Sequence, residues 1–96
     1  MTTYIVSRHP GAIAWLLNRF AEATVRTHVT PDDFQPGDTV VGTLPVHLLA
    51  ALQARGVRCL SLVVPLEAGD RGRELHIPDL DRLGAYLAEY RVQCVG

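Results

Sequence analysis

Two polar junctions in this chain of 96 residues carry the side chains best suited to chemistry on a phosphate group. One is the run Ser7-Arg8-His9-Pro10-Gly11, and the other is the stretch 37–52, which contains His47. A guanidinium group binds phosphate through two parallel hydrogen bonds, and an imidazole can exchange a proton near neutral pH. Residues of these types would bind an anion and move protons to or from it, so phosphate is the leading candidate ligand.

Both junctions lie where a predicted strand passes into a predicted helix. In α/β sheets, ligands bind at the carboxyl ends of strands, where helix N-termini present unpaired N–H groups. We therefore expect the two junctions to converge on one pocket, with Arg8 as a phosphate ligand and His9 as a ligand or an acid–base group. The alternative at Arg8 and His9 is a simple polar turn, and the alternative at His47 is a solvent-facing side chain.

A third polar run, Asp70-Arg71-Gly72-Arg73-Glu74, places two arginines on either side of a glycine in a predicted loop. Arginines with this spacing could fold over a phosphodiester as a lid. Asp70 and Glu74 could instead pair with both arginines locally and leave a solvated, charge-balanced loop.

The remaining residues of chemically interesting types are given structural roles or none. We expect Trp15 to pack in the core, with stacking on a base or a partner subunit as the alternative, and we assign no role to His28 or His76. Cys59 and Cys94 lie in apolar, strand-like runs, where cysteine usually packs as a small hydrophobe. The chain has no C-x₂-C pair or similar ligand spacing, so we expect no metal and no cofactor.

The elements that must position these residues alternate between strand and helix. Apolar residues at Ile13, Leu16, Leu17 and Phe20 predict one face of a first helix after Gly11. Strands are predicted at 3–7, 23–29, 38–41, 57–65 and 88–95, and further helices at about 44–55 and at 78–83. The order predicts right-handed crossovers, and so a compact Rossmann-like α/β fold with a mainly parallel sheet and an antiparallel C-terminal edge strand.

The second helix has recognisable boundary residues. Thr43 is expected to cap its N-terminus, Pro45 suits its first turn, and Gly56 supplies a left-handed end.

Composition and charge limit the possible functions. Residues 1–96 are expected to form a single domain of ordinary globular composition, with 48% hydrophobic and 20% charged residues. The net charge of -1 argues against a protein that coats long nucleic acid. All nine basic residues are arginine. No apolar run approaches the ~20 residues of a membrane span, and we expect a cytoplasmic protein with no membrane partner.

Three stretches together resemble a known family: Ser7–Trp15 (SRHPGAIAW), Gly37–His47 (GDTVVGTLPVH) and Arg71–Leu75 (RGREL). They are similar to short stand-alone CRISPR-associated proteins counted among the ring nucleases of type III systems. The resemblance implies a fold akin to the CRISPR-associated Rossmann-fold (CARF) sensor domains. It also implies a homodimer that binds cyclic tetra-adenylate and opens it, which switches off the antiviral signal.

Such a ring carries its own nucleophile, the ribose 2′-hydroxyl, so in-line attack can open it without a metal and give a linear product with a 2′,3′-cyclic phosphate. The protein need only orient the groups, stabilise charge and shuttle protons. We expect Arg8, Arg71 and Arg73 to bind phosphate and His9 or His47 to act as acid or base. The other expected ligand-binding residues are Ser7, Gly11, Gly42, Thr43, Leu44 and Gly72.

Three other functions remain open from the sequence. One is a sensor that binds the cyclic nucleotide without cutting it. Another is a histidine phosphatase, suggested by Arg8-His9 after a strand, although Pro10 replaces the glycine of that signature and the chain is short for that fold. The third is a small structural subunit or inhibitor that dimerises through the edge at 88–95.

Overall fold

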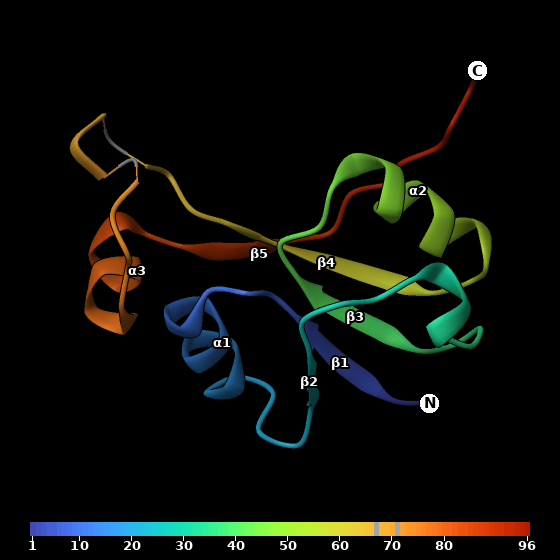
Figure 1. Cartoon of the computed structure of the whole chain (residues 1–96), viewed down its shortest axis with the longest axis horizontal. Helices are drawn as coiled ribbons and strands as arrows, with labels where there is room; N and C mark the ends of the chain where they lie inside the picture. Colours follow the sequence, from blue (N-terminus) through green and yellow to red (C-terminus); the bar gives the residue numbers. More distant parts are fainter. Residues whose placement is uncertain (67, 71) are drawn as a thin grey trace.

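A five-stranded mixed sheet lies between two layers of helices in the computed structural model, which describes residues 1–66, 68–70 and 72–96 (Figure 1). The strand order is β2-β1-β3-β4-β5; β5 runs antiparallel to β4, and the other pairs are parallel. This confirms the expected α/β class. The elements are β1 (Thr3–Val6), α1 (Pro10–Leu17), β2 (Thr24–Arg26), η1 (Pro31–Asp33), β3 (Thr39–Gly42), α2 (Val46–Ala54), β4 (Arg58–Val63), η2 (Ala68–Asp70), α3 (Ile77–Leu83) and β5 (Tyr86–Ala88).

Successive side chains of the central strands point to opposite faces of the sheet, and apolar side chains lie on both faces. In β1, Ile5 packs into the core beneath α1 and α3, whereas its neighbour Val6 packs into the core beneath α2. Val41 and Val40 in β3 divide in the same way. Because side chains of the central strands are buried on both faces, the fold needs a helical layer on each side.

Helix α1 buries a different face from the one its longest aliphatic residues predict. Trp15 is 1% exposed and Leu16 is fully buried, whereas Ile13 and Leu17 are only partly buried. The Trp15 indole Nε1–H donates to Asp81 Oδ1 at 3.0 Å. This bond satisfies the polar atom of the ring, which confirms that Trp15 packs in the core.

Helix α2 begins two residues later than predicted, so Thr43 is not its cap. Pro45 has an extended backbone and occupies the N-cap position, and its carbonyl accepts the N–H groups of Leu48 and Leu49. Beyond the end of α2, Gly56 has a φ of +84°, which confirms the left-handed stop.

The last strand lies earlier in the chain than predicted and is shorter. Gly84, with φ of +78°, ends α3, and the chain enters β5 within two residues. After Ala88 the chain leaves the sheet and is held by Gln53, whose side-chain amide donates to the Tyr90 carbonyl and accepts the Val92 N–H at 2.8 Å. The predicted edge strand at 88–95 is therefore wrong over most of its length.

The two cysteines lie in different environments. Cys59 is buried in β4, and burial raises the pKa of its thiol to about 11, so it is a packing residue as expected. Cys94 is exposed, which contradicts the expectation that it packs in the core. The difference follows from the C-terminal segment, which runs outside the sheet.

Candidate functional site

An open cleft of about 810 Å³ lies at the carboxyl ends of β1 and β3. These are neighbouring parallel strands, and the helices that follow them, α1 and α2, cover opposite faces of the sheet (Figure 1). In an open α/β sheet this change of direction leaves a crevice between the two connections. The volume lies in the range of small-molecule sites, so this cleft is the candidate functional site.

The two junctions singled out in the sequence meet at this cleft. Val6, Ser7, Arg8 and His9 line it from the end of β1, and Thr43, Leu44, Pro45 and His47 line it from the end of β3 and the start of α2. Arg8, His9, Thr43 and His47 are exposed, and Ser7 is only 3% exposed. The expected convergence of the two junctions is therefore present in the fold.

Ser7 shapes the turn that carries the exposed residues. Its hydroxyl oxygen accepts the backbone N–H of His9 at 3.1 Å, and its own N–H donates to the Arg26 carbonyl at 3.3 Å. A serine that bonds to the backbone two residues later stabilises a tight turn at the end of a strand. Ser7 thus fixes the direction in which Arg8 and His9 leave the sheet.

Gly42 and Thr43 form the backbone at the second junction, where β3 ends. A Cβ atom on Gly42 would lie 2.0 Å from the Val6 carbonyl oxygen, and Gly42 has a φ of +154°, so only glycine fits there. The N–H of Thr43 donates to the same carbonyl at 3.3 Å. The Thr43 backbone donor is thus engaged with the protein, while Thr43 as a residue lines the cleft.

His28, for which the sequence predicts no role, also lines the cleft. Its Nδ1 lies 3.1 Å from Arg8 Nη2. A guanidinium group has donors but no acceptor, so Nδ1 must accept this bond, and the proton of the neutral ring is then on Nε2. The contact makes His28 the third histidine of the site, after His9 and His47.

The signal that could have located His28 is its position just beyond a parallel strand. The predicted strand 23–29 placed His28 within the sheet, whereas β2 ends at Arg26. The carboxyl ends of parallel strands lie at one edge, so the residues after Arg26 join those after Val6. Thr27, Thr30 and Asp33 line the cleft from the same connection, and the Asp33 carboxylate accepts the Thr30 N–H at 2.7 Å.

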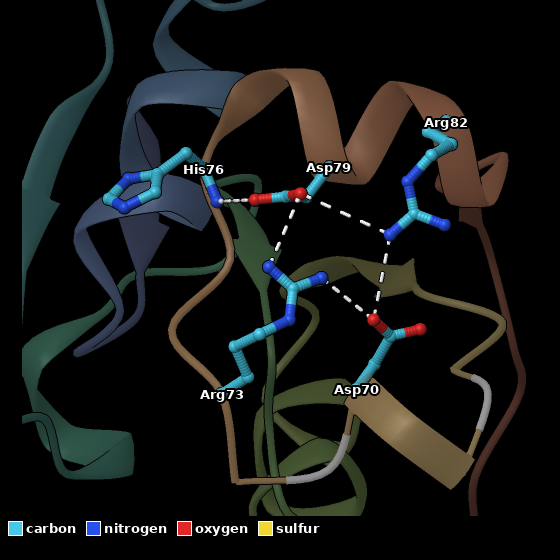
Figure 2. A network of polar contacts seen from close by, with 5 residues as sticks. All are labelled: Asp70, Arg73, His76, Asp79 and Arg82. Atoms are coloured by element: carbon cyan, nitrogen blue, oxygen red, sulfur yellow. Dashed lines mark hydrogen bonds and ion pairs between the residues drawn. The ribbon is translucent and has the colours of Figure 1, made fainter.

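The described part of the predicted arginine lid, Gly72 and Arg73, lies beside the cleft instead of over it. Gly72 and Arg73 line a second cavity, which shares His9 and Thr43 with the cleft. Arg73 is paired with Asp70 at 2.7 Å and with Asp79 at 3.4 Å, as Figure 2 shows. The local pairing by Asp70 that the sequence left open is thus present, and it raises the pKa of the Arg73 guanidinium. Arg71 lies outside the described residues.

Gly11 is buried at the start of α1, and it is not among the described residues on the wall of either cavity. A Cβ atom there would lie 1.7 Å from the Leu75 carbonyl oxygen. Glycine at position 11 is therefore explained by the close approach of α1 to the chain before α3.

A scan against protein-family models found a match over residues 4–93 to the family Cas_VVA1548, described as "Putative CRISPR-associated protein". The chain belongs to this family. A search of the curated proteins and a search of the solved structures each found no match.

The match to this CRISPR-associated family includes every described residue that lines the cleft. These residues lie between positions 6 and 51, and the match spans residues 4–93.

Within the described part of the chain, no helix is long and apolar enough to cross a membrane. The same residues include no group of three or more His, Cys, Asp or Glu side chains that could hold a metal ion. The described side chains that line the cleft and could take part in chemistry are the guanidinium group of Arg8, three imidazoles, several hydroxyl groups and the Asp33 carboxylate.

Proposed function

We propose that this member of the CRISPR-associated family is a ring nuclease that binds cyclic tetra-adenylate and cleaves it. The observation that carries the proposal is one open cleft that contains Arg8, His9, His28 and His47. A cation supports the binding of a phosphate, and imidazole groups beside it support proton transfer at that phosphate. The resemblance of the three sequence stretches to ring nucleases selects the ligand from among phosphate compounds.

The proposed reaction is a transesterification within the ring. One imidazole takes the proton from a ribose 2′-hydroxyl, and the 2′-oxygen attacks the adjacent phosphorus. The bond from phosphorus to the 5′-oxygen breaks, and the 5′-oxygen takes a proton from a second imidazole, which is protonated at the start and neutral at the end. The products are a 2′,3′-cyclic phosphate and a 5′-hydroxyl on one linear chain, so atoms and charge balance without a further reactant.

The residues have distinct roles in this reaction. Arg8 stabilises charge on the phosphoryl oxygens, and His9 and His47 are the candidate base and acid. His28 accepts a bond from Arg8 and keeps an Nε2–H for donation, so it orients the guanidinium group. Thr43, which lines the cleft, supplies a hydroxyl donor.

A homodimer would explain how a small chain accommodates a ring of four nucleotides. Such a ring has a two-fold axis, and so does a pair of identical subunits. Two clefts facing one another would present every cationic side chain of the cleft twice to the four phosphates of the ring. The site could therefore be locally positive even though the net charge of each chain is -1. The proposed site is therefore shared between two copies of the chain.

The test is the mass of the product. Purified protein in excess over labelled cyclic tetra-adenylate, with EDTA present, is expected to give linear tetra-adenylate or shorter chains with a 2′,3′-cyclic phosphate. A ring that is bound but survives intact would contradict cleavage and favour the non-cleaving sensor. A ring that is neither bound nor cleaved would contradict the ligand as well.

A further inference from the structure

The second cavity, of about 380 Å³, adjoins the cleft and is not used by the proposed reaction. His9 and Thr43 line both spaces, so the two meet at the carboxyl ends of β1 and β3. From this shared edge, the cleft extends along η1 and α2, whereas the second cavity extends toward α3. A ligand whose phosphate lay at His9 and Thr43 would therefore have a second space beside that phosphate.

The described walls of the second cavity suit another phosphate poorly, because half of the lining residues are aliphatic and Asp70 and Glu74 add negative charge. Six of its lining residues are aliphatic: Ala12, Leu62, Val64, Leu66, Leu75 and Leu80. Three of them, Ala12, Leu62 and Leu80, are at most 7% exposed, so their positions are fixed by the core. Walls of this kind favour a flat, weakly hydrated group and disfavour a charged one.

Among the described residues that line this cavity, Arg73 is the only arginine, and its guanidinium group is already paired with carboxylates. Its guanidinium N–H groups point to Asp70 and Asp79, and Arg82 joins the same two carboxylates at 3.5 and 4.0 Å (Figure 2). The network connects η2 to α3 and holds the guanidinium group at the cavity wall. A guanidinium group whose N–H donors are used by carboxylates still has flat faces, on which a nucleobase can stack.

We propose that the second cavity binds an adenine base of the ring, with Arg73 as a stacking platform instead of a phosphate ligand. This inference rests on the proposed function and names the part of the substrate that the cavity recognises. The phosphate attached to that nucleotide lies at His9 and Thr43. The four-residue ion-pair network of Asp70, Arg73, Asp79 and Arg82 acts as a positioning device for the base.

Substitutions of Arg73 separate the two roles. Arg73→Lys keeps the charge and can keep an ion pair, but it removes the flat face. We expect it to weaken binding of cyclic tetra-adenylate roughly 3- to 30-fold, with the dependence of the affinity on salt unchanged. An affinity equal to that of the parent protein would instead indicate that Arg73 is not a base platform.

Filling the cavity gives a second line of evidence. Leu66 lines the cavity and is 51% exposed, so Leu66→Trp can block the space without disturbing the core. Its control is Val95→Trp, at a position that is 94% exposed in the C-terminal segment. We expect only Leu66→Trp to weaken binding of the ring, and equal binding by both variants would contradict a base in the cavity.

The direct test uses methyl NMR of the intact protein with two probes, adenosine 5′-monophosphate and ribose 5-phosphate, neither of which requires cleavage. Adenosine 5′-monophosphate is expected to shift the methyl signals of Leu62, Leu75 and Leu80, and ribose 5-phosphate is expected to leave them unchanged. Shifts confined to the cleft methyls of Leu44 and Leu48, or no shifts, would overturn the proposal. Cavity shifts in a protein that leaves cyclic tetra-adenylate intact would support the base site and reject the nuclease.

Discussion

An arginine that donates to a histidine ring nitrogen determines where the proton of that histidine lies. The contact between Arg8 and His28 therefore joins two functional groups at the scale of single residues, because it orients the guanidinium group and leaves Nε2–H as the free donor of the ring. Ser7 acts at the same scale, through the hydroxyl oxygen that accepts the His9 N–H. These contacts position the exposed side chains of the cleft before any ligand binds.

Gly42 gives a sharp prediction at the residue scale. Gly42→Ala would force a Cβ against the Val6 carbonyl in a backbone conformation that alanine rarely adopts. We expect it to lower the free energy of unfolding by about 2–4 kcal/mol, measured by urea denaturation.

The matched control for that change is Gly69→Ala, because no atom of the described residues lies within 4 Å of the Cβ that it would add. This variant should stay within about 0.5 kcal/mol of the parent protein. Equal urea midpoints for the two variants would show that the close approach at Gly42 carries no energetic cost.

At the scale of elements, the start of β3 is tied to the N-terminus by a buried carboxylate. Asp38 is 6% exposed, and its oxygens accept the N–H of Gln35 at 2.9 Å and the N–H of Thr2 at 3.0 Å. The bond from Gln35, followed by that from Thr2, lowers the pKa of Asp38 below its ordinary value of 3.8. The turn before β3 and the segment before β1 are thereby held beside each other.

The pH dependence of this contribution follows from the direction of the pKa change. Because the folded state holds the carboxylate ionised, Asp38 stabilises the fold above pH 3.8, and the contribution is lost as the pH falls through the lowered folded pKa. Asp38→Asn should therefore reduce the free energy of unfolding by about 1–2 kcal/mol at pH 7, with the difference shrinking below pH 4.

Urea denaturation at pH 7 and at pH 3 measures this difference. Asp32→Asn is the control, since its side chain is 92% exposed and makes only a 3.5 Å ion pair with Arg55. If Asp38→Asn lowered the free energy of unfolding equally at both pH values, the charge of Asp38 would not contribute to the stability of the fold.

Most elements could be predicted from the sequence because their apolar periodicity survives in the fold. The strand predicted at 57–65 contains β4, and the helix predicted at 78–83 differs from α3 by one residue at its start. The strand predicted at 88–95 could not be corrected from periodicity, because the end of the sheet there depends on tertiary hydrogen bonds from Gln53. Local alternation in 88–95 is compatible with either outcome.

The site was predictable to the extent that it follows from topology. Ser7–His9 and Thr43–His47 lie after parallel strands, and parallel strands bring their carboxyl ends to one edge. Arg73 could not be placed in the same way, because its position depends on ion pairs with Asp70 and Asp79, which are side-chain contacts. His28 was missed because the strand before it is three residues long.

At the scale of the whole molecule, the proposal requires two copies of the chain for one ring. Light scattering of the protein with cyclic tetra-adenylate is expected to give twice the 10.5 kDa of one chain, and calorimetry should give one ring for two chains. A monomer that binds one ring per chain would contradict the shared site.

Single-turnover cleavage of labelled cyclic tetra-adenylate tests most directly whether the cleft is the site of ring opening. The comparison is between the parent protein, His9→Ala, His47→Ala, and His76→Ala, which removes an exposed histidine before α3. We expect the parent to open the ring, His76→Ala to match it, and at least one cleft variant to be slower by about 10²–10⁴-fold. An intact ring with the parent protein, or cleavage at the parent rate by both cleft variants, would contradict catalysis at this cleft.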